Sequence, residues 1–195
     1  LTVRERRDGL GVDAARFGDP TYVAPANLDF QLIDATTGNT RALFPDKVDV
    51  SAITFSKDGS QLAFLRRQGD DWSLWVHDVV ANRTRQVALQ TRKPLASNSP
   101  LVWAPDGRSV LIALRPDGWA AGARAAFLHL SDGEIVVQNA QLPFLAWDSV
   151  RNVGDRQIPA VVTLSDGAVR EILPETDLRG AQFSADGSYL AYSTA

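Results

Sequence analysis

One ten-residue phrase occurs three times in this chain, and it limits the possible folds more than any other feature. Each copy has an aromatic residue, two further residues, the dipeptide Asp-Gly and then an apolar run. The copies are Phe55–Phe64, Trp103–Ile112 and Phe183–Tyr192. Asp-Gly between apolar runs favours a tight turn, because glycine accepts the positive φ that such a turn requires. The sequence therefore predicts the same β-hairpin at three places.

A second hairpin phrase follows the first one and repeats independently of it. It consists of an apolar run, a polar turn and a shorter run. Its four turns contain Gly38, Asn82, Gly133 and Gly167. These turn residues are 44, 51 and 34 positions apart. A degenerate copy of the first phrase at Trp147 fills the long gap between Trp103 and Phe183, so that both phrases share a period of roughly 35 to 50 residues.

The residues between the turns are typical of strands. The runs are short and rich in Val, Ile, Leu, Phe, Trp and Thr, and we find no long apolar stripe with helical spacing. Each period then holds two hairpins, which we designate strands a to d from the axis outward. Four-stranded antiparallel units of this length in tandem predict an all-β fold, a β-propeller with about four blades.

The phrases also predict where the blades lie. Residues 1–27 form an N-terminal extension, and residues 28–195 form the propeller. The expected units are a c–d half-blade at 28–44, blades at 50–89, 100–138 and 143–173, and an a–b half-blade at 179–195. Joining the two half-blades would close a small ring, which would remove open sheet edges. The alternative, which we favour, is a larger ring of which this chain is one part, because the chain contains no methionine and stops directly after a strand b.

Composition excludes several classes of function. The net charge of −3 provides no attraction for nucleic acid, and no apolar run approaches the roughly 18 residues of a membrane helix. We therefore expect a soluble protein that binds neither nucleic acid nor membrane. The absence of cysteine excludes disulfides and thiolate chemistry. It leaves the compartment open between cytoplasm and periplasm or secretion.

The two phrases together resemble the repeats of TolB-like propellers. The same repeats form the N-terminal propeller of the prolyl oligopeptidase family of serine peptidases. Trp103–Ile112 and Phe55–Phe64 match best, whereas Phe183–Tyr192 has Ala185 at the proline position and Phe55–Phe64 has Lys57 there. The long polar link before Leu101 and the irregular spacing of the blades are similar to bacterial members of the peptidase family.

The resemblance to the peptidases implies a role without catalysis. In that family a separate α/β-hydrolase domain carries the catalytic serine on a Gly-x-Ser-x-Gly turn, and this sequence contains no such motif. The implied function is a propeller segment that gates or orients peptide substrate and packs on the hydrolase domain, and that is no enzyme on its own. The implied partners are that domain or the peptide.

No residue stands out as a catalytic group, a cofactor ligand or a metal ligand. His77 and His129 are the only histidines, and both are predicted on c strands as structural residues, since a metal site usually needs three ligands. Asp58, Asp106 and Asp186 are explained by turn geometry. Trp119, with Arg115 and Arg124, lies in a Gly/Ala/Arg-rich loop between strands b and c. These three residues are our candidates for contacts with a partner.

Two other functions remain open on the sequence. One is a TolB-like protein–protein interaction propeller with no enzymatic partner domain. The other is a propeller enzyme, such as a lactonase, with a metal on the central axis. It is disfavoured because the starts of the a strands carry no set of ligands. In either case a partial ring exposes strand edges and apolar faces, which predicts homo-oligomers through the blade edges.

Overall fold

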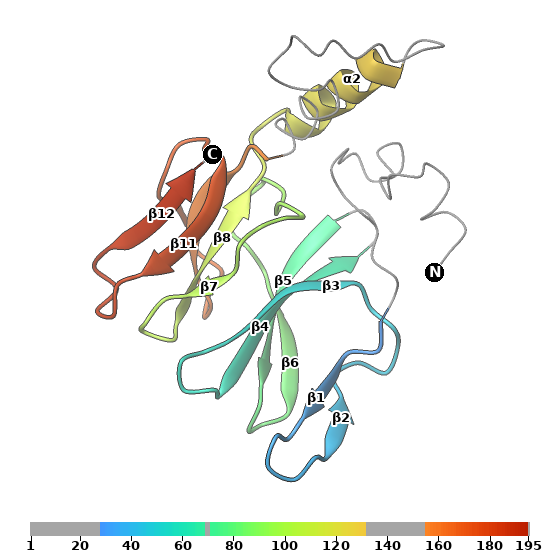
Figure 1. Ribbon diagram of the computed structural model, residues 1–195, viewed down its shortest axis with the longest axis vertical. Helices are drawn as coiled ribbons and strands as arrows, with labels where there is room; N and C mark the ends of the chain where they lie inside the picture. Colours follow the sequence, from blue (N-terminus) through green and yellow to red (C-terminus); the bar gives the residue numbers. More distant parts are fainter. Residues whose placement is uncertain (1–27, 69–70, 132–154, 195) are drawn as a thin grey trace, which may run out of the picture.

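The computed structural model describes residues 28–68, 71–131 and 155–194, and they form antiparallel sheets and one helix. The N-terminal half of the described chain contains β1 (Gln31–Ile33), β2 (Thr40–Ala42), β3 (Val50–Phe55), β4 (Gln61–Gln68), β5 (Asp71–Asp78) and β6 (Arg83–Val87). The remainder contains β7 (Val102–Trp103), β8 (Ser109–Leu114), α2 (Trp119–Ser131), β9 (Ile158–Thr163), β10 (Val169–Glu171), β11 (Leu178–Phe183) and β12 (Leu190–Thr194). Figure 1 shows the sheets side by side as layers of a fan, with α2 projecting from one end.

The sheets are two complete blades and two half-blades within the described residues. The first blade has the strand order β3-β4-β5-β6, and the second has β7-β8-β9-β10. The N-terminal half-blade is the hairpin β1-β2, and the C-terminal half-blade is β11-β12. This is a partial β-propeller with four-stranded antiparallel blades, and the predicted fold class is confirmed. The first blade extends from Val50 to Val87, and the two half-blades extend from Gln31 to Ala42 and from Leu178 to Thr194.

The second blade departs from our expectation. We expected separate units at 100–138 and 143–173, but β8 pairs directly with β9, from Ser109 with Thr163 to Leu114 with Ile158. The hairpin around Gly167 therefore completes the blade that Trp103 begins. Residues 115–157 connect strands b and c of one blade. Gly133 and Trp147, which suggested an additional unit, lie outside the described residues.

The helix α2 occupies residues that we predicted as loop and strand. Its sequence, Trp-Ala-Ala-Gly-Ala-Arg-Ala-Ala-Phe-Leu-His-Leu-Ser, is rich in alanine, which has the highest helix propensity. The neighbouring strand β8 is buried from Val110 to Leu114, so that its free edge requires another apolar strand. Ile158–Thr163 meets that requirement, because most of its side chains are buried as well. Intrinsic propensity and burial together explain why the Phe127–His129 phrase is not strand c.

The core lies between the blades. Side chains alternate along a strand, so each blade has two faces. On the first blade, Leu65 and Val76 face the second blade in one cluster, while Leu62 and Phe64 pack with the N-terminal half-blade in another. Because both faces are covered, the strand β4 is apolar at consecutive positions and shows no alternation. The half-blade contributes Phe30, whose ring lies 5.2 Å from that of Phe64 in an edge-to-face arrangement.

The Asp-Gly turns have the geometry that the sequence predicts. Gly59, Gly107 and Gly187 all have positive φ. In the first turn, Asp58 accepts hydrogen bonds from the Ser56 hydroxyl at 2.7 Å and from the Ser60 backbone N–H at 3.1 Å. These bonds lower the pKa of Asp58 to about 2. The aspartates of these turns hold the hairpins together, as we predicted for Asp58, Asp106 and Asp186.

Candidate functional site

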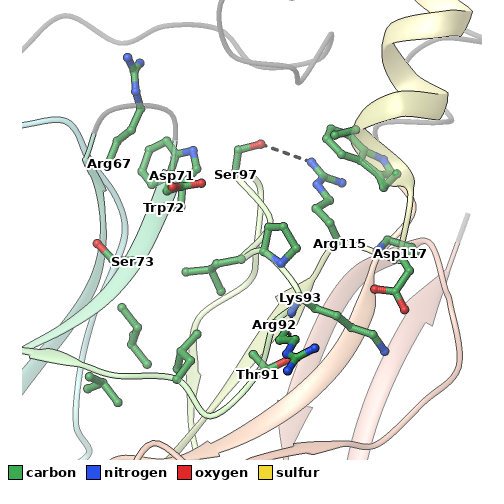
Figure 2. Close-up of a pocket in the computed structure, with 18 of the residues that line it drawn as sticks. Arg67, Asp71, Trp72, Ser73, Thr91, Arg92, Lys93, Ser97, Arg115 and Asp117 are labelled. Carbon is green, nitrogen blue, oxygen red and sulfur yellow. Dashed lines mark hydrogen bonds between the residues drawn. The ribbon is translucent and has the colours of Figure 1, made fainter.

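A cavity of about 530 Å³ lies at the end of the blades opposite the Asp-Gly turns. One wall is the start of β5 and the end of β6, and the other is the segment 91–97 together with the start of α2. Figure 2 shows Asp71 and Trp72 on one side of the cavity, and Lys93, Arg115 and Asp117 on the other. The long connection between β8 and β9 leaves from this end. The site therefore lies between two blades and beside the one helix of the described residues.

Arg115 stabilises one wall of this cavity through several hydrogen bonds. Its side chain is only 3% exposed, and its guanidinium donates hydrogen bonds to the Asn98 side chain at 3.0 Å, the Ser97 hydroxyl at 3.3 Å and the Arg156 backbone carbonyl at 3.1 Å. The guanidinium carbon also lies 4.0 Å from the centre of the Trp119 ring, a distance typical of a cation–π contact. Arg115 thus connects the inter-blade link, the start of α2 and the return to β9.

The structure brings together two of the three residues that we predicted to contact a partner. Arg115 and Trp119 are brought together, with Trp119 half-buried against the guanidinium and lining the cavity. Arg124 is exposed on α2 and is not among the residues that line the cavity. Partner contact by these residues remains a prediction, and it falls on Trp119 and Arg124, because the buried guanidinium of Arg115 is engaged by its own chain.

The cavity has more cationic than acidic side chains. Arg67, Arg92, Lys93 and Arg115 line it together with Asp71 and Asp117. Arg67 is paired with Asp49 at 3.3 Å, and Lys93 is paired with Glu171 at 2.6 Å. The hydrogen bond from Lys93 to Glu171 raises the pKa of Lys93, so this ammonium group stays charged. Two cations of the lining are therefore balanced within the protein.

Arg92, Asp71 and Asp117 are the charged groups at the cavity that are available to a ligand. All three are exposed, and within the described chain none of their side chains makes a hydrogen bond or an ion pair. Arg92 belongs to the inter-blade link, and Asp71 begins β5. Our sequence analysis missed both residues, together with Trp72. Only the blade topology could have indicated them. In an antiparallel four-stranded blade, the turn between strands b and c and the link that follows strand d lie at the same end, and these two segments carry Asp71 and Arg92.

The histidines do not form a reactive site in the described structure. His77 lies on β5, as predicted, is 1% exposed, and its Nδ1 is 2.9 Å from the Thr84 hydroxyl on β6. Burial lowers its pKa, and the positive charge of Arg41 adds to that effect. His129 was predicted on a c strand but lies within α2. The described residues contain no group of three or more His, Cys, Asp or Glu side chains that could hold a metal ion.

The helix α2 has 13 residues. Among the residues that the structure covers, no helix combines the length and the apolar character that are needed to cross a bilayer.

The groups that the cavity offers to a ligand are suited to recognition. They are two indole rings, the charged side chains at its mouth and the hydroxyl groups of Ser73, Thr91 and Ser97.

Comparison with solved structures places this arrangement among known folds. The crystal structure of TolB from Acinetobacter baumannii is similar over 83% of this chain and 31% of that chain, with a TM-score of 0.50 and 15% sequence identity. The fold is that of a TolB-like propeller. No family model and no curated protein matches the sequence. At this identity, the likeness to TolB concerns the fold alone.

Two structures of the acylaminoacyl peptidase from Pyrococcus horikoshii are similar to a lower degree. The orthorhombic crystal form gives a TM-score of 0.42 over 72% of this chain, and the uncomplexed form gives 0.44 over 82%, both at 16% identity. These scores are too low to support an argument about this chain. The TolB-like propeller described here spans 31%, 19% and 22% of the lengths of the chains in these three structures, which is less than a third in each case.

Proposed function

We propose that this TolB-like propeller recognises a polypeptide segment and does not cleave it. The observation that carries the proposal is the cavity beside Trp72 and Trp119, with Arg92 and Asp71 available at its mouth. Indole rings bury large apolar areas with little loss of conformational entropy, and they are common where proteins bind proteins. A peptide offers the apolar and charged groups that such a lining complements.

Arg92 provides a contact for an acidic group of the peptide. Of the four cationic side chains in the lining, Arg67 and Lys93 are paired with carboxylates and Arg115 is buried. Arg92 is the exposed cation of the lining, and no ion pair within the described chain neutralises it. We therefore expect a ligand with an acidic side chain next to apolar or aromatic residues.

The first form of this function is gating in a peptidase. In this form the chain orients peptide substrate and packs on an α/β-hydrolase domain of a prolyl-oligopeptidase-like enzyme. The observation in its favour is the long b–c connection, residues 115–157, which carries α2 away from the propeller next to the cavity (Figure 1). Such a projection provides a surface for a second domain on the same side as the peptide site.

The second form is a protein–protein interaction propeller without a hydrolase. The exposed aromatic side chains of Tyr189 and Tyr192 on the C-terminal half-blade favour it, because exposed aromatic groups mark interaction surfaces more often than ordinary surface. The two forms differ in the partner and share the recognition of polypeptide.

The binding of short peptides tests the shared claim. Labelled peptides with the sequence pattern acidic–aromatic–apolar would be titrated against the chain, and basic peptides of the same length would serve as controls. Arg92→Ala should weaken binding of the acidic peptide by about two- to five-fold, the usual effect of an exposed charge pair, whereas Asp71→Asn should strengthen it. Arg108→Ala is the matched control, because Arg108 is exposed on an Asp-Gly turn at the opposite end. Equal binding of acidic and basic peptides, unaffected by Arg92, would refute the proposal.

A purified α/β-hydrolase domain of the prolyl oligopeptidase type would then separate the two forms. Stable association with this domain, weakened by substitution of Arg124 on α2, supports gating. Peptide binding without such association supports the interaction propeller.

A further inference from the structure

Equivalent hydrogen bonds join the sheets at two boundaries. At the first boundary, Arg41 of the N-terminal half-blade donates to the Val79 backbone carbonyl of the first blade at 2.7 Å. At the second boundary, Arg85 of the first blade donates to the Leu164 backbone carbonyl of the second blade at 3.0 Å. Both arginines stand three positions after the turn residue of the second hairpin phrase, and both carbonyls stand three positions before it. The repeat therefore builds the same contact twice.

A histidine lies at only one of these boundaries. His77 stands two residues before Val79, and the same position of the second blade holds Val162. His77 pairs with Leu62 of β4, whose side chain packs with the N-terminal half-blade. Directly opposed residues of an antiparallel pair have their side chains on the same face, so His77 faces the half-blade. Its side chain is 1% exposed, and the first boundary therefore encloses a group that can take up a proton.

The surroundings of His77 suit a neutral imidazole. Its Nδ1 is 2.9 Å from the Thr84 hydroxyl of β6, and its Nε2 has no hydrogen-bond partner among the described residues. Burial lowers the pKa of His77, and the positive charge of Arg41 on β2 adds to that effect, while Asp78 on its own strand opposes it. On β4, Arg66 adds a further positive charge on the same side of the blade, over the ring of an aromatic residue.

The carboxylate nearest to the bond on the half-blade is engaged elsewhere. Asp34 borders a groove of about 410 Å³ beside Arg41 and Val79. Its carboxylate accepts the backbone N–H groups of Thr36 and Thr37 at 2.8 and 3.1 Å, within its own turn. A proton on His77 would thus create a buried cation whose Nε2–H lacks an acceptor, and such a group is costly until water reaches it. The groove provides that water at the edge of the boundary.

We propose that protonation of His77 opens the first boundary, between the N-terminal half-blade and the first blade, while the second boundary stays closed. The opening breaks the bond from Arg41 to Val79 and hydrates the imidazolium. At the second boundary, Val162 cannot take up a proton, so the equivalent bond from Arg85 persists. The proposal does not depend on the peptide cavity, which lies between the first and the second blade, so either proposal can fail without the other.

The sign of the pH dependence follows from the two states of His77. In the open state its ring contacts water and has the ordinary pKa of 6.5, whereas in the closed state its pKa is lower. The open state therefore binds the proton more tightly, and its population rises as the pH falls below the ordinary value. The rise is at most about tenfold per pH unit, which gives up to about thirtyfold at about pH 5.

Thiol labelling reports the two boundaries separately, because the chain contains no cysteine. Leu43 and Val87 are buried at the same position of the second hairpin phrase, so Leu43→Cys probes the first boundary and Val87→Cys the second. A pyridyl disulfide, which reacts in acid, is applied to each full chain at about pH 7.5 and about pH 5, on both sides of the ordinary histidine pKa. Each rate is divided by that of Val80→Cys, an exposed position.

The expected result differs between the two probes. The relative labelling rate of Leu43→Cys should rise by about tenfold or more in acid, whereas that of Val87→Cys should change by less than about threefold. Circular dichroism at both pH values checks that each chain is folded. If Leu43→Cys does not fold, Leu62→Cys reports from the first-blade side of the same boundary.

Two further substitutions in the Leu43→Cys chain assign the effect to His77. His77→Asn keeps a polar group beside Thr84 but cannot be protonated, and it should abolish the acid rise. Arg41→Gln keeps a donor for the Val79 carbonyl and removes the charge, and it should make the rise smaller. A labelling rate that does not respond to acid would overturn the proposal. So would an acid rise that persists in His77→Asn, or one that is equally large for Val87→Cys.

Discussion

The indole Nε1 of Trp103 donates a hydrogen bond to the backbone carbonyl of Thr54, 3.1 Å away, across the boundary between the two complete blades. Trp103 opens the second copy of the Asp-Gly phrase, and Thr54 stands directly before the aromatic residue that opens the first. The innermost strands of neighbouring blades are therefore joined by a polar bond as well as by apolar packing. The bond lies beside an irregularity of β3 between Ser51 and Thr54, where Ala52 adopts a positive φ.

Replacing Trp103 by phenylalanine should therefore weaken the contact between the blades. The change keeps most of the apolar area and removes the N–H donor, so we expect a loss of about 1 kcal/mol in the free energy of unfolding. Urea denaturation followed by circular dichroism measures it. Val80→Ala, at an exposed turn position, should leave the stability unchanged. If Trp103→Phe behaved like this control, the hydrogen bond would contribute nothing.

A pair of glycines separates backbone strain from steric overlap. Gly59 and Gly167 both have a positive φ, but only Gly167 faces another segment, where an added Cβ would lie 1.9 Å from the Ala88 carbonyl oxygen. Gly59→Ala should cost about 1 kcal/mol of stability through strain alone. Gly167→Ala should cost about 2–4 kcal/mol, because the turn must also move away from the inter-blade link. Parallel urea titrations of the two variants test the difference, and equal losses would contradict the described contact.

The serine hydroxyl in the first Asp-Gly turn should control the acidity of its aspartate. The Ser56 hydroxyl and the Ser60 N–H hold the pKa of Asp58 at about 2, below the ordinary 3.8. Ser56→Ala should raise the pKa of Asp58 and leave that of Asp186 at about 2, and Ser184→Ala should do the reverse. Carboxyl chemical shifts in a pH titration by NMR report both values. A common change at both aspartates would show that the turns are not independent.

These low pKa values also determine the sign of the acid response. A carboxyl group whose pKa is lower in the folded than in the unfolded protein stabilises the fold at pH values above its pKa in the unfolded protein. Its contribution is lost as the pH falls from about 4 towards 2. In the Ser56→Ala variant this loss of stability should be smaller, because the pKa values of Asp58 in the folded and in the unfolded protein then lie closer together. Unfolding measurements over that pH range test the expectation.

His77 should make the protein less stable in mild acid. Burial lowers its pKa below the ordinary 6.5, and the nearby charge of Arg41 acts in the same direction, while Asp78 opposes it. The unfolded chain therefore binds a proton first, and stability falls as the pH drops below about 6.5. Between pH 7.5 and pH 5, the free energy of unfolding should change less in His77→Asn than in the wild type. This range extends from about one unit above to about 1.5 units below the ordinary histidine pKa of 6.5. Val80→Ala, at an exposed position, is the control, and it should keep the wild-type slope. A steep profile in His77→Asn would contradict the prediction.

Much of the fold could be predicted because its signals are local. The Asp-Gly turns, the short apolar runs and the polar c–d turns depend on residues within about ten positions of one another, and backbone sterics act at that range. The position of the first blade follows from two such hairpins in succession. The candidate site could not be predicted in the same way. Arg92 and Asp71 belong to different segments, and neither belongs to a motif.

The sequence by itself determined the hairpins, the all-β class and the blade as the repeating unit, since turn chemistry and strand composition are properties of neighbouring residues. Only the tertiary structure decided which hairpins share a blade. The buried strand β8 needs an apolar partner along its edge, and β9 supplies it from beyond a connection of more than forty residues, 115–157. The pairing of β8 with β9 is decided by the burial of apolar side chains on both strands. The entropy cost of closing the long loop between them rises only slowly with its length, and no local sequence pattern indicates the pairing. The same packing brings Arg115 beneath Trp119 and forms the cavity.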